Sequence, residues 1–310
     1  MNKLKILYID GFSTGCNYYK DIIYVLSKYS ILRHISKNII HNIENFFPNV
    51  IIFGFSFCNL LCNNLDVNFY INLKKYNIPI YLILNKEYTG LDNKLNWIKK
   101  VKPRKVFTVH HDFKKYSRIC NVPFYRIMWS ANHKIFKKYN DIYKYDLYFS
   151  GVIREEQTGN LRHRIYNRIV NLNELDKYKL LLKVGIYKNG IMDGKNNPFN
   201  LEEYAININN SKIVLTTTGP TDIVGTRYFE IMASNKALIL CNRMDKLIYE
   251  DIVIDKFNCI MFQDEFDFIE KCKYYLENEN ERIKIVNQAY KFFIEKHTWE
   301  NKVKDLLNNL

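Results

Sequence analysis

The stretch SKIVLTTTGPTDIVGTRYFEIMASNKALILC, Ser211–Cys241, decides the fold. Its apolar start predicts a strand that ends at Thr216, and a loop of small residues follows. A helix is predicted from Thr226 to Ser234, and a second apolar strand covers Ala237–Cys241. A strand, a helix and a strand in this order indicate a crossover between parallel strands, because such strands need a long connection.

The same alternation extends over the whole chain. Further strands are predicted at Leu4–Ile9, Val50–Phe57, Ile78–Leu84, Val106–Val109, Asp146–Ser150, Lys179–Val184 and Cys259–Phe262. Amphipathic stretches between them predict helices. The sequence therefore predicts an α/β protein with two doubly wound, Rossmann-like halves. The polar segment 132–144 interrupts the rhythm, so we expect domains at 1–135 and 136–310.

The composition is that of a globular protein, with 47% hydrophobic and 25% charged residues in 310. The net charge of +14 favours anionic partners: a nucleotide diphosphate, an anionic surface or nucleic acid. The alternative is that lysine is simply frequent in this proteome. The apolar runs are too short to span a membrane. The seven cysteines are scattered, without zinc spacing, which predicts free thiols, a cytoplasmic location and no metal site.

The loop after Thr216 has the features of a phosphate site. Free backbone N–H groups at a helix start, together with the helix dipole, favour an anion there. Arg227 in the first turn can hold a diphosphate oxygen, and Glu230 one turn later can accept hydrogen bonds from ribose hydroxyls. We predict a donor-nucleotide site at Thr218, Gly219, Gly225, Thr226, Arg227 and Glu230. The alternative is an ordinary surface Arg–Glu pair.

Weaker candidates follow two other strands of this half. Gly151 and Arg154 lie at the end of the predicted strand Asp146–Ser150, where the backbone can approach a pyrophosphate. Lys183 near the end of the next strand can neutralise phosphate. For Arg162, at the start of the next helix, and for Arg164 we expect a solvated helix face; the alternative is that one of them reaches phosphate.

The first half has one candidate catalytic cluster. His110 and His111 follow the strand Val106–Val109, and one of them can serve as a general base for an acceptor hydroxyl, oriented by Asp112. The alternative for Asp112 is the N-cap of a helix from Phe113 to Ile119. The loop Asp10–Thr14 is expected to line the acceptor side.

Four segments in order resemble the CgeB-like (spore-maturation-protein-like) glycosyltransferases. In chain order, the segments are NVPFYRIMWSANHKIFKK with YDLYFSGV, GTRYFEIMASNKALIL, YYLENENERIKIVNQAY and EKHTW. The resemblance covers residues 120–310 and implies the GT-B fold. That fold has two Rossmann-like domains facing a central cleft, with the final helices packed back on the N-terminal domain.

The resemblance also implies roles for two acidic residues. Glu230 matches the second acid of the EX7E pattern of retaining GT-B transferases, which holds the donor ribose. Asp222 stands where those enzymes have the first acid, a Glu near the reacting carbon. We therefore expect metal-independent, retaining transfer of a sugar from a nucleotide-diphosphate sugar to a hydroxyl of a glycan, protein or small molecule, without a cofactor. The alternatives are a nucleic-acid-directed glycosyltransferase and a non-catalytic nucleotide- or carbohydrate-binding protein.

Overall fold

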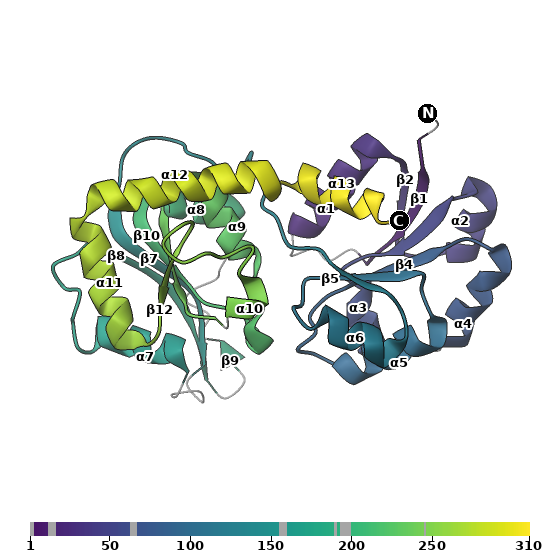
Figure 1. The fold of residues 1–310 in the computed structure, drawn as a ribbon, viewed down its shortest axis with the longest axis horizontal. Helices are drawn as coiled ribbons and strands as arrows, with labels where there is room; N and C mark the ends of the chain where they lie inside the picture. Colours follow the sequence, from purple (N-terminus) through teal and green to yellow (C-terminus); the bar gives the residue numbers. More distant parts are fainter. Residues whose placement is uncertain are drawn as a thin grey trace. The chain divides into compact units, whose positions relative to one another are not determined.

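The computed structural model describes residues 3–11, 17–62, 67–154, 160–188, 191–192, 200–244 and 246–310. The chain forms two compact units, shown in Figure 1. Unit 1 comprises residues 1–129 and 299–310, and unit 2 comprises residues 130–298. The division between Trp129 and Ser130 lies a few residues before the predicted boundary at 135/136.

Unit 1 is built on a parallel six-stranded sheet in the order β2-β1-β3-β4-β5-β6. The strands are β1 (Lys5–Ile9), β2 (Ile31–Ile35), β3 (Val50–Phe53), β4 (Ile80–Leu84), β5 (Lys105–Thr108) and β6 (Phe124–Arg126). The strand order reverses direction at β1. In a doubly wound sheet, ligands bind beyond the carboxyl ends of the strands near such a reversal.

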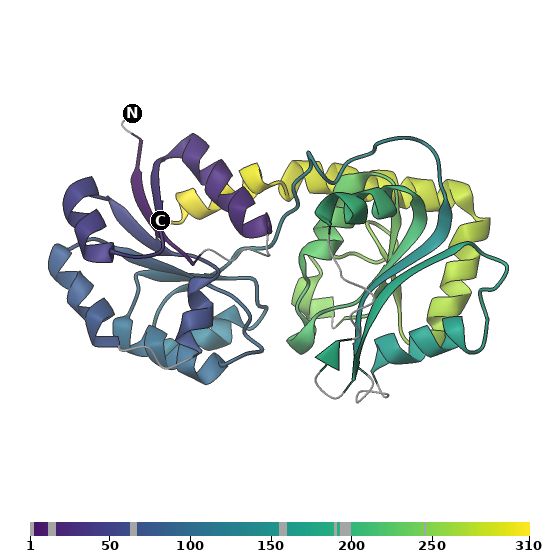
Figure 2. The same cartoon turned by 180° about the vertical axis from the view of Figure 1, so that it is seen from behind.

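The helices of unit 1 cover both faces of this sheet. One face packs against α2 (Ile39–Phe46), α3 (Phe57–Leu61), α4 (Val67–Asn72), α5 (Leu91–Val101) and α6 (Phe113–Cys120). The other face carries α1 (Asn17–Tyr29) and the last helix α13 (Trp299–Asn308), which lie side by side in Figures 1 and 2. The Tyr81 hydroxyl donates a hydrogen bond to the Leu310 carbonyl at 2.6 Å, so the chain end is fixed to this sheet.

Unit 2 has a second six-stranded sheet, in the order β12-β11-β10-β7-β8-β9. Its strands are β7 (Tyr145–Arg154), β8 (Leu180–Lys188), β9 (Ile191–Met192), β10 (Ser211–Thr216), β11 (Leu238–Asn242) and β12 (Ile260–Phe262). All pairings are parallel except that of β8 with β9. The carboxyl ends of β7, β10 and β11 are therefore neighbours at one edge.

The helices of unit 2 are α7 (Leu161–Val170), α8 (Leu201–Asn209), α9 (Thr226–Ser234), α10 (Lys246–Tyr249), α11 (Glu265–Glu277) and α12 (Glu279–Lys296). A cluster of buried apolar residues joins α7 and α11 to the sheet. Helix α9 contacts α8, α12 and β11. Of the final helices, α13 belongs to unit 1, whereas α11 and α12 belong to unit 2.

Two parallel-sheet α/β domains confirm the predicted fold class, but some strands differ from the prediction. The predicted strand Val50–Phe57 ends at Phe53, and its apolar run continues into the buried side of helix α3. The edge strands β2 and β6 were not predicted, because their residues are only partly buried and include charged side chains. Within the described ranges, no helix is both long and apolar enough to cross a membrane.

Candidate donor-nucleotide site

Two arginines from different helices meet at Gly151 in strand β7. Arg227, in the first turn of α9, donates from Nη1 to the Ser150 carbonyl at 2.8 Å. Arg162, in the first turn of α7, donates from Nη1 to the Val152 carbonyl at 3.1 Å. A Cβ atom on Gly151 would lie 3.0 Å from Nη1 of Arg227 and 3.2 Å from Nη1 of Arg162. Gly151 also has φ of 143°, a conformation that favours glycine.

The charges of these two arginines lie close enough to interact. Burial, and next the charge of Arg227, lower the pKa of Arg162 to about 10. Among the residues that the structure describes, neither guanidinium forms an ion pair with a carboxylate. Arg162 instead donates from Nε to the Thr217 hydroxyl at 3.2 Å. Two adjacent half-buried cations without an acidic partner are a site for a multiply charged anion.

For Arg162 the sequence favoured a solvated face and left a phosphate contact as the alternative; the structure places its guanidinium at β7 instead of in solvent. Its neighbour Arg164 does point away from the site, and its Nε donates to the Glu265 carboxylate at 2.8 Å. The two arginines differ in their position along the helix. Arg162 is the second residue of a helix that follows the glycine-containing strand β7, where its side chain can return to the strand end.

The loop between β10 and α9 is held by Asn242 at the end of β11. The Asn242 Oδ1 accepts the Thr218 amide at 2.8 Å, and its Nδ2 donates to the Thr218 hydroxyl at 3.2 Å. Gly219 donates its amide to the Ile223 carbonyl at 2.8 Å, which closes a tight turn. The loop is therefore fixed before any ligand binds.

Helix α9 begins without a side-chain cap. Its N-cap is Gly225, which has no side chain to accept a hydrogen bond from the first turn, and that turn starts at Thr226. A Cβ atom on Gly225 would meet nothing within 4 Å. In the part of the chain that the structure describes, no N-cap side chain binds the first-turn amides, and uncapped helix N-termini of this kind bind phosphate in other proteins.

Glu230 lies one turn after Arg227 and is 8% exposed. The Tyr204 side chain of α8 lies against it. Burial, and next the Glu230 charge, raise the pKa of Tyr204 well above its usual value. Because a buried carboxylate needs hydrogen-bond donors, this position suits an acceptor for sugar hydroxyls. Arg227 lies at Gly151 and Glu230 lies one turn after it on α9, and their assignment to a donor site stays a prediction.

Three further predicted residues have different surroundings. Asp222 is exposed with φ of 56°, and its Oδ1 accepts from the Thr218 hydroxyl at 3.4 Å. Lys183 pairs with Glu203 at 3.6 Å, so its charge is already partnered. The side chain of Arg154 lies outside the described residues.

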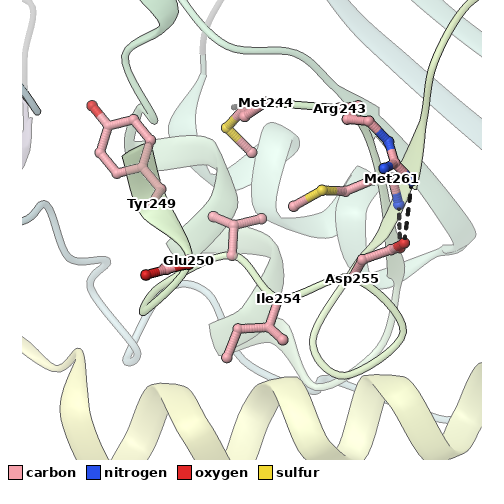
Figure 3. Close-up of a pocket in the computed structure, with 8 residues that line it drawn as sticks. Arg243, Met244, Tyr249, Glu250, Ile254, Asp255 and Met261 are labelled. Atoms are coloured by element: carbon pink, nitrogen blue, oxygen red, sulfur yellow. Dashed lines mark hydrogen bonds and ion pairs between the residues drawn. The ribbon is translucent and has the colours of Figure 1, made fainter. Parts of the chain in front are cut away.

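A pocket of about 290 Å³ adjoins this region in unit 2 (Figure 3). Its apolar lining is Met244, Tyr249, Val253, Ile254 and Met261, and its charged lining is Arg243, Glu250 and Asp255. Arg243 and Asp255 form an ion pair at 3.9 Å. Within the described ranges, Arg243 thus has a carboxylate partner, unlike the two arginines at Gly151. Arg243 directly follows Asn242, so the pocket continues from the segment that holds the donor loop.

In unit 1, His110 is suited to donate a hydrogen bond. Its Nδ1 accepts the Asp112 amide at 3.0 Å, so the neutral ring carries its proton on Nε2. Burial, and next His111, lower the pKa of His110 to about 4. The lone pair that a general base needs is thus already occupied. Asp112 stands at the N-cap of α6, but its side chain caps no amide of that helix.

His111 is the better placed of the two histidines for a base. Its ring stacks on His110 with centroids 4.2 Å apart, and its Nε2 lies 4.0 Å from Asp112 Oδ1. Ligand atoms of His110, His111 and Asp112 lie within 4.8 Å of one another. The three could hold a metal ion only if the neutral His110 ring gave up its Nε2 proton, because its Nδ1 accepts the Asp112 amide.

Two buried carboxyl groups lie after strands of unit 1: Asp10, in the loop predicted to line the acceptor side, and Glu87, which was not predicted. Asp10 directly follows β1, and burial raises its pKa to about 6, although it accepts the Phe57 amide at 3.0 Å. Glu87, which follows β4, is 2% exposed and accepts a hydrogen bond from the Thr108 hydroxyl. Of the predicted loop Asp10–Thr14, residues 12–14 lie outside the described residues.

Comparisons with known proteins agree with this architecture. Residues 183–308 match the family model described as glycosyl transferase-like. HepE from Anabaena, solved with UDP and glucose, has a TM-score of 0.66 at 8% identity, with 99% of each chain covered. Sucrose-phosphate synthase from Thermosynechococcus elongatus has a TM-score of 0.67 at 9% identity, with 99% of this chain and 98% of that chain covered. None of the curated proteins matches the sequence.

At such low identity the two structures establish the fold alone, which is GT-B. The fold has two Rossmann-like domains, and part of the second is similar in sequence to glycosyl transferases. The matching residues 183–308 contain α9 and the loop before it.

Proposed function

We propose that this protein transfers a glycosyl group from a nucleotide-diphosphate sugar to an acceptor hydroxyl, without a metal. The observation that carries the proposal is the convergence of Arg162 and Arg227 on Gly151, beside the uncapped start of α9. A departing nucleoside diphosphate carries two or three negative charges. Two guanidinium groups and a helix N-terminus can stabilise that charge without a cation.

The remaining residues of the site take roles that follow from their positions. Glu230 accepts hydrogen bonds from the ribose hydroxyls, and Asp222 approaches the donor sugar from the loop. Their spacing supports retention of configuration and membership of the CgeB-like group. His111, with Asp112 beside it, is the candidate base in unit 1, and His110 donates from Nε2.

UDP-sugars are the first donors to test, since HepE was solved with UDP and with UDP-glucose. The acceptor is a glycan, protein or small molecule, and the charge of +14 keeps an anionic surface or nucleic acid among the candidates. A cytoplasmic location also belongs to the proposal. Its support is that the six cysteines in the described ranges are free thiols.

A donor screen tests the proposal. A nucleoside diphosphate or its sugar at 100 times its dissociation constant should stabilise the protein by about 2.7 kcal/mol. Hydrolysis or transfer of the bound donor should continue in excess chelator, with retained anomeric configuration in the product. Activity that disappears in chelator and returns with Mn²⁺ or Mg²⁺ would refute metal independence, and no stabilisation by any donor would refute the function.

A further inference from the structure

Two buried tyrosines interact with charged residues of α9: Tyr148 with Arg227, and Tyr204 with Glu230 and Arg227. Tyr148 in β7 is 2% exposed and Tyr204 in α8 is 5% exposed, with ring centroids 6.0 Å apart. Phe136 meets the Tyr204 ring edge-on at 5.9 Å. The Tyr204 ring is therefore held by packing on two sides, which fixes the place of its hydroxyl.

The surroundings of the Tyr204 hydroxyl support a hydrogen bond to Glu230. This hydroxyl lies against Glu230, and the negative charge there disfavours ionisation of the phenol. A tyrosine hydroxyl is protonated at neutral pH, so it can donate to the carboxylate. An ionised carboxylate has about four lone-pair positions, so one bond to Tyr204 leaves the others open.

We propose that Tyr204 is a specificity-determining residue, which holds the Glu230 carboxylate in the orientation that accepts both ribose hydroxyls. This inference rests on the proposed donor site. A carboxylate that rotates freely would accept a hydrogen bond from one hydroxyl at a time. The ribose 2′-hydroxyl would then add little to the binding affinity. Tyr204 thereby gives the site its preference for ribose over 2′-deoxyribose.

The test compares ribose with deoxyribose ligands. Titration calorimetry with UDP, GDP and ADP identifies the diphosphate that the wild-type protein binds most tightly, and its 2′-deoxy form is then titrated. We expect wild type to prefer the ribose form by about tenfold or more, since a hydrogen bond to a charged group is lost in the deoxy form. Tyr204→Phe should remove most of that preference while leaving affinity for the 2′-deoxy form unchanged.

A matched control is available in the same unit. Tyr275 is buried, and its hydroxyl donates to Glu281 Oε1 at 3.4 Å, on helices away from the donor loop. Tyr275→Phe removes the same kind of contact and should keep the ribose preference. Adding Tyr204→Phe to the Glu230→Gln variant should not lower the preference for the ribose form any further, because Tyr204 acts through Glu230. If Tyr204→Phe does not fold, Tyr204→Met of similar volume makes the same comparison.

The outcomes separate this inference from the donor site itself. Equal losses of affinity for the ribose and deoxy forms would mean that Tyr204 only supports packing, and would overturn the inference. A preserved preference in Tyr204→Phe, or a wild-type protein that binds both forms equally, would overturn it too while leaving the donor site standing. A wild-type protein that binds none of the diphosphates would overturn the proposed function, and the inference with it.

Discussion

Arg162 and Arg227 come from different helices, yet both guanidinium groups lie against one glycine. Arg227 was predictable, because a helix start after a small-residue loop is a local feature of the sequence. For Arg162 the sequence favoured a solvated face, because its contact with β7 depends on the return of α7 to that strand. A local sequence pattern indicates a candidate anion site, whereas the number of arginines that gather there depends on tertiary structure.

The arginine pair gives the sharpest prediction at this scale. Replacing Arg162 or Arg227 by Ala should weaken binding of the nucleoside diphosphate by roughly 10- to 100-fold, because each loses a charge-assisted hydrogen bond to phosphate. Affinity for the free nucleoside should not change. Titration calorimetry of both ligands measures the difference, and circular dichroism checks the fold.

Arg164→Ala is the control for this prediction. It removes an arginine from the same helix, but one that pairs with Glu265. This variant should bind diphosphate like wild type. If Arg162→Ala also binds diphosphate like wild type, the pair at Gly151 is not the phosphate site.

At the scale of elements, burial decided which strands were predictable. The central strands β3 and β4 are buried on both faces and appear in the sequence as continuous apolar runs. The edge strand β2 is only partly buried and contains Arg33 and His34, so its pattern is weak. The short strand β9 is defined by its antiparallel pairing with β8, which no local pattern specifies.

Helix α9 supplies a prediction in which stability and binding change in opposite directions. Gly225→Asp places a carboxylate at the N-cap, where it can accept the amides of the first turn. The space around Gly225 admits the side chain. The free energy of unfolding should rise by about 0.3–1 kcal/mol through capping and the helix dipole. Diphosphate binding should weaken by at least about tenfold, since the carboxylate occupies and repels the anion site.

Gly225→Ala separates charge from size at the same position. It adds a methyl group without a charge and should bind diphosphate nearly as wild type does. Thermal unfolding and calorimetry on the three proteins measure both quantities. An Asp variant that keeps wild-type affinity would show that the start of α9 does not face the phosphate.

At the scale of the whole molecule, the chain leaves unit 1 at residue 129 and returns to it for its last helix. Helix α13 buries Trp299, Val303 and Leu306 completely or nearly so. The sequence predicted final helices on the N-terminal domain, but not that the change of unit occurs between Thr298 and Trp299. Helical periodicity finds a helix and its apolar side, and only the fold specifies the sheet that it covers.

This arrangement predicts that the two units lose stability separately. Ending the chain at Thr298 removes three buried side chains, each worth about 1.5–3 kcal/mol, from unit 1. The sum approaches the whole stability of a typical domain, so unit 1 should unfold at or near room temperature. Unit 2 keeps every donor-site residue and should remain folded and protected by the bound diphosphate. Limited proteolysis with mass spectrometry should then yield a resistant fragment close to 130–298, more resistant with diphosphate present.

The milder variant Leu306→Ala should lower only the first of two melting transitions. A truncated chain that melts and resists protease like the full chain would mean that α13 does not stabilise unit 1.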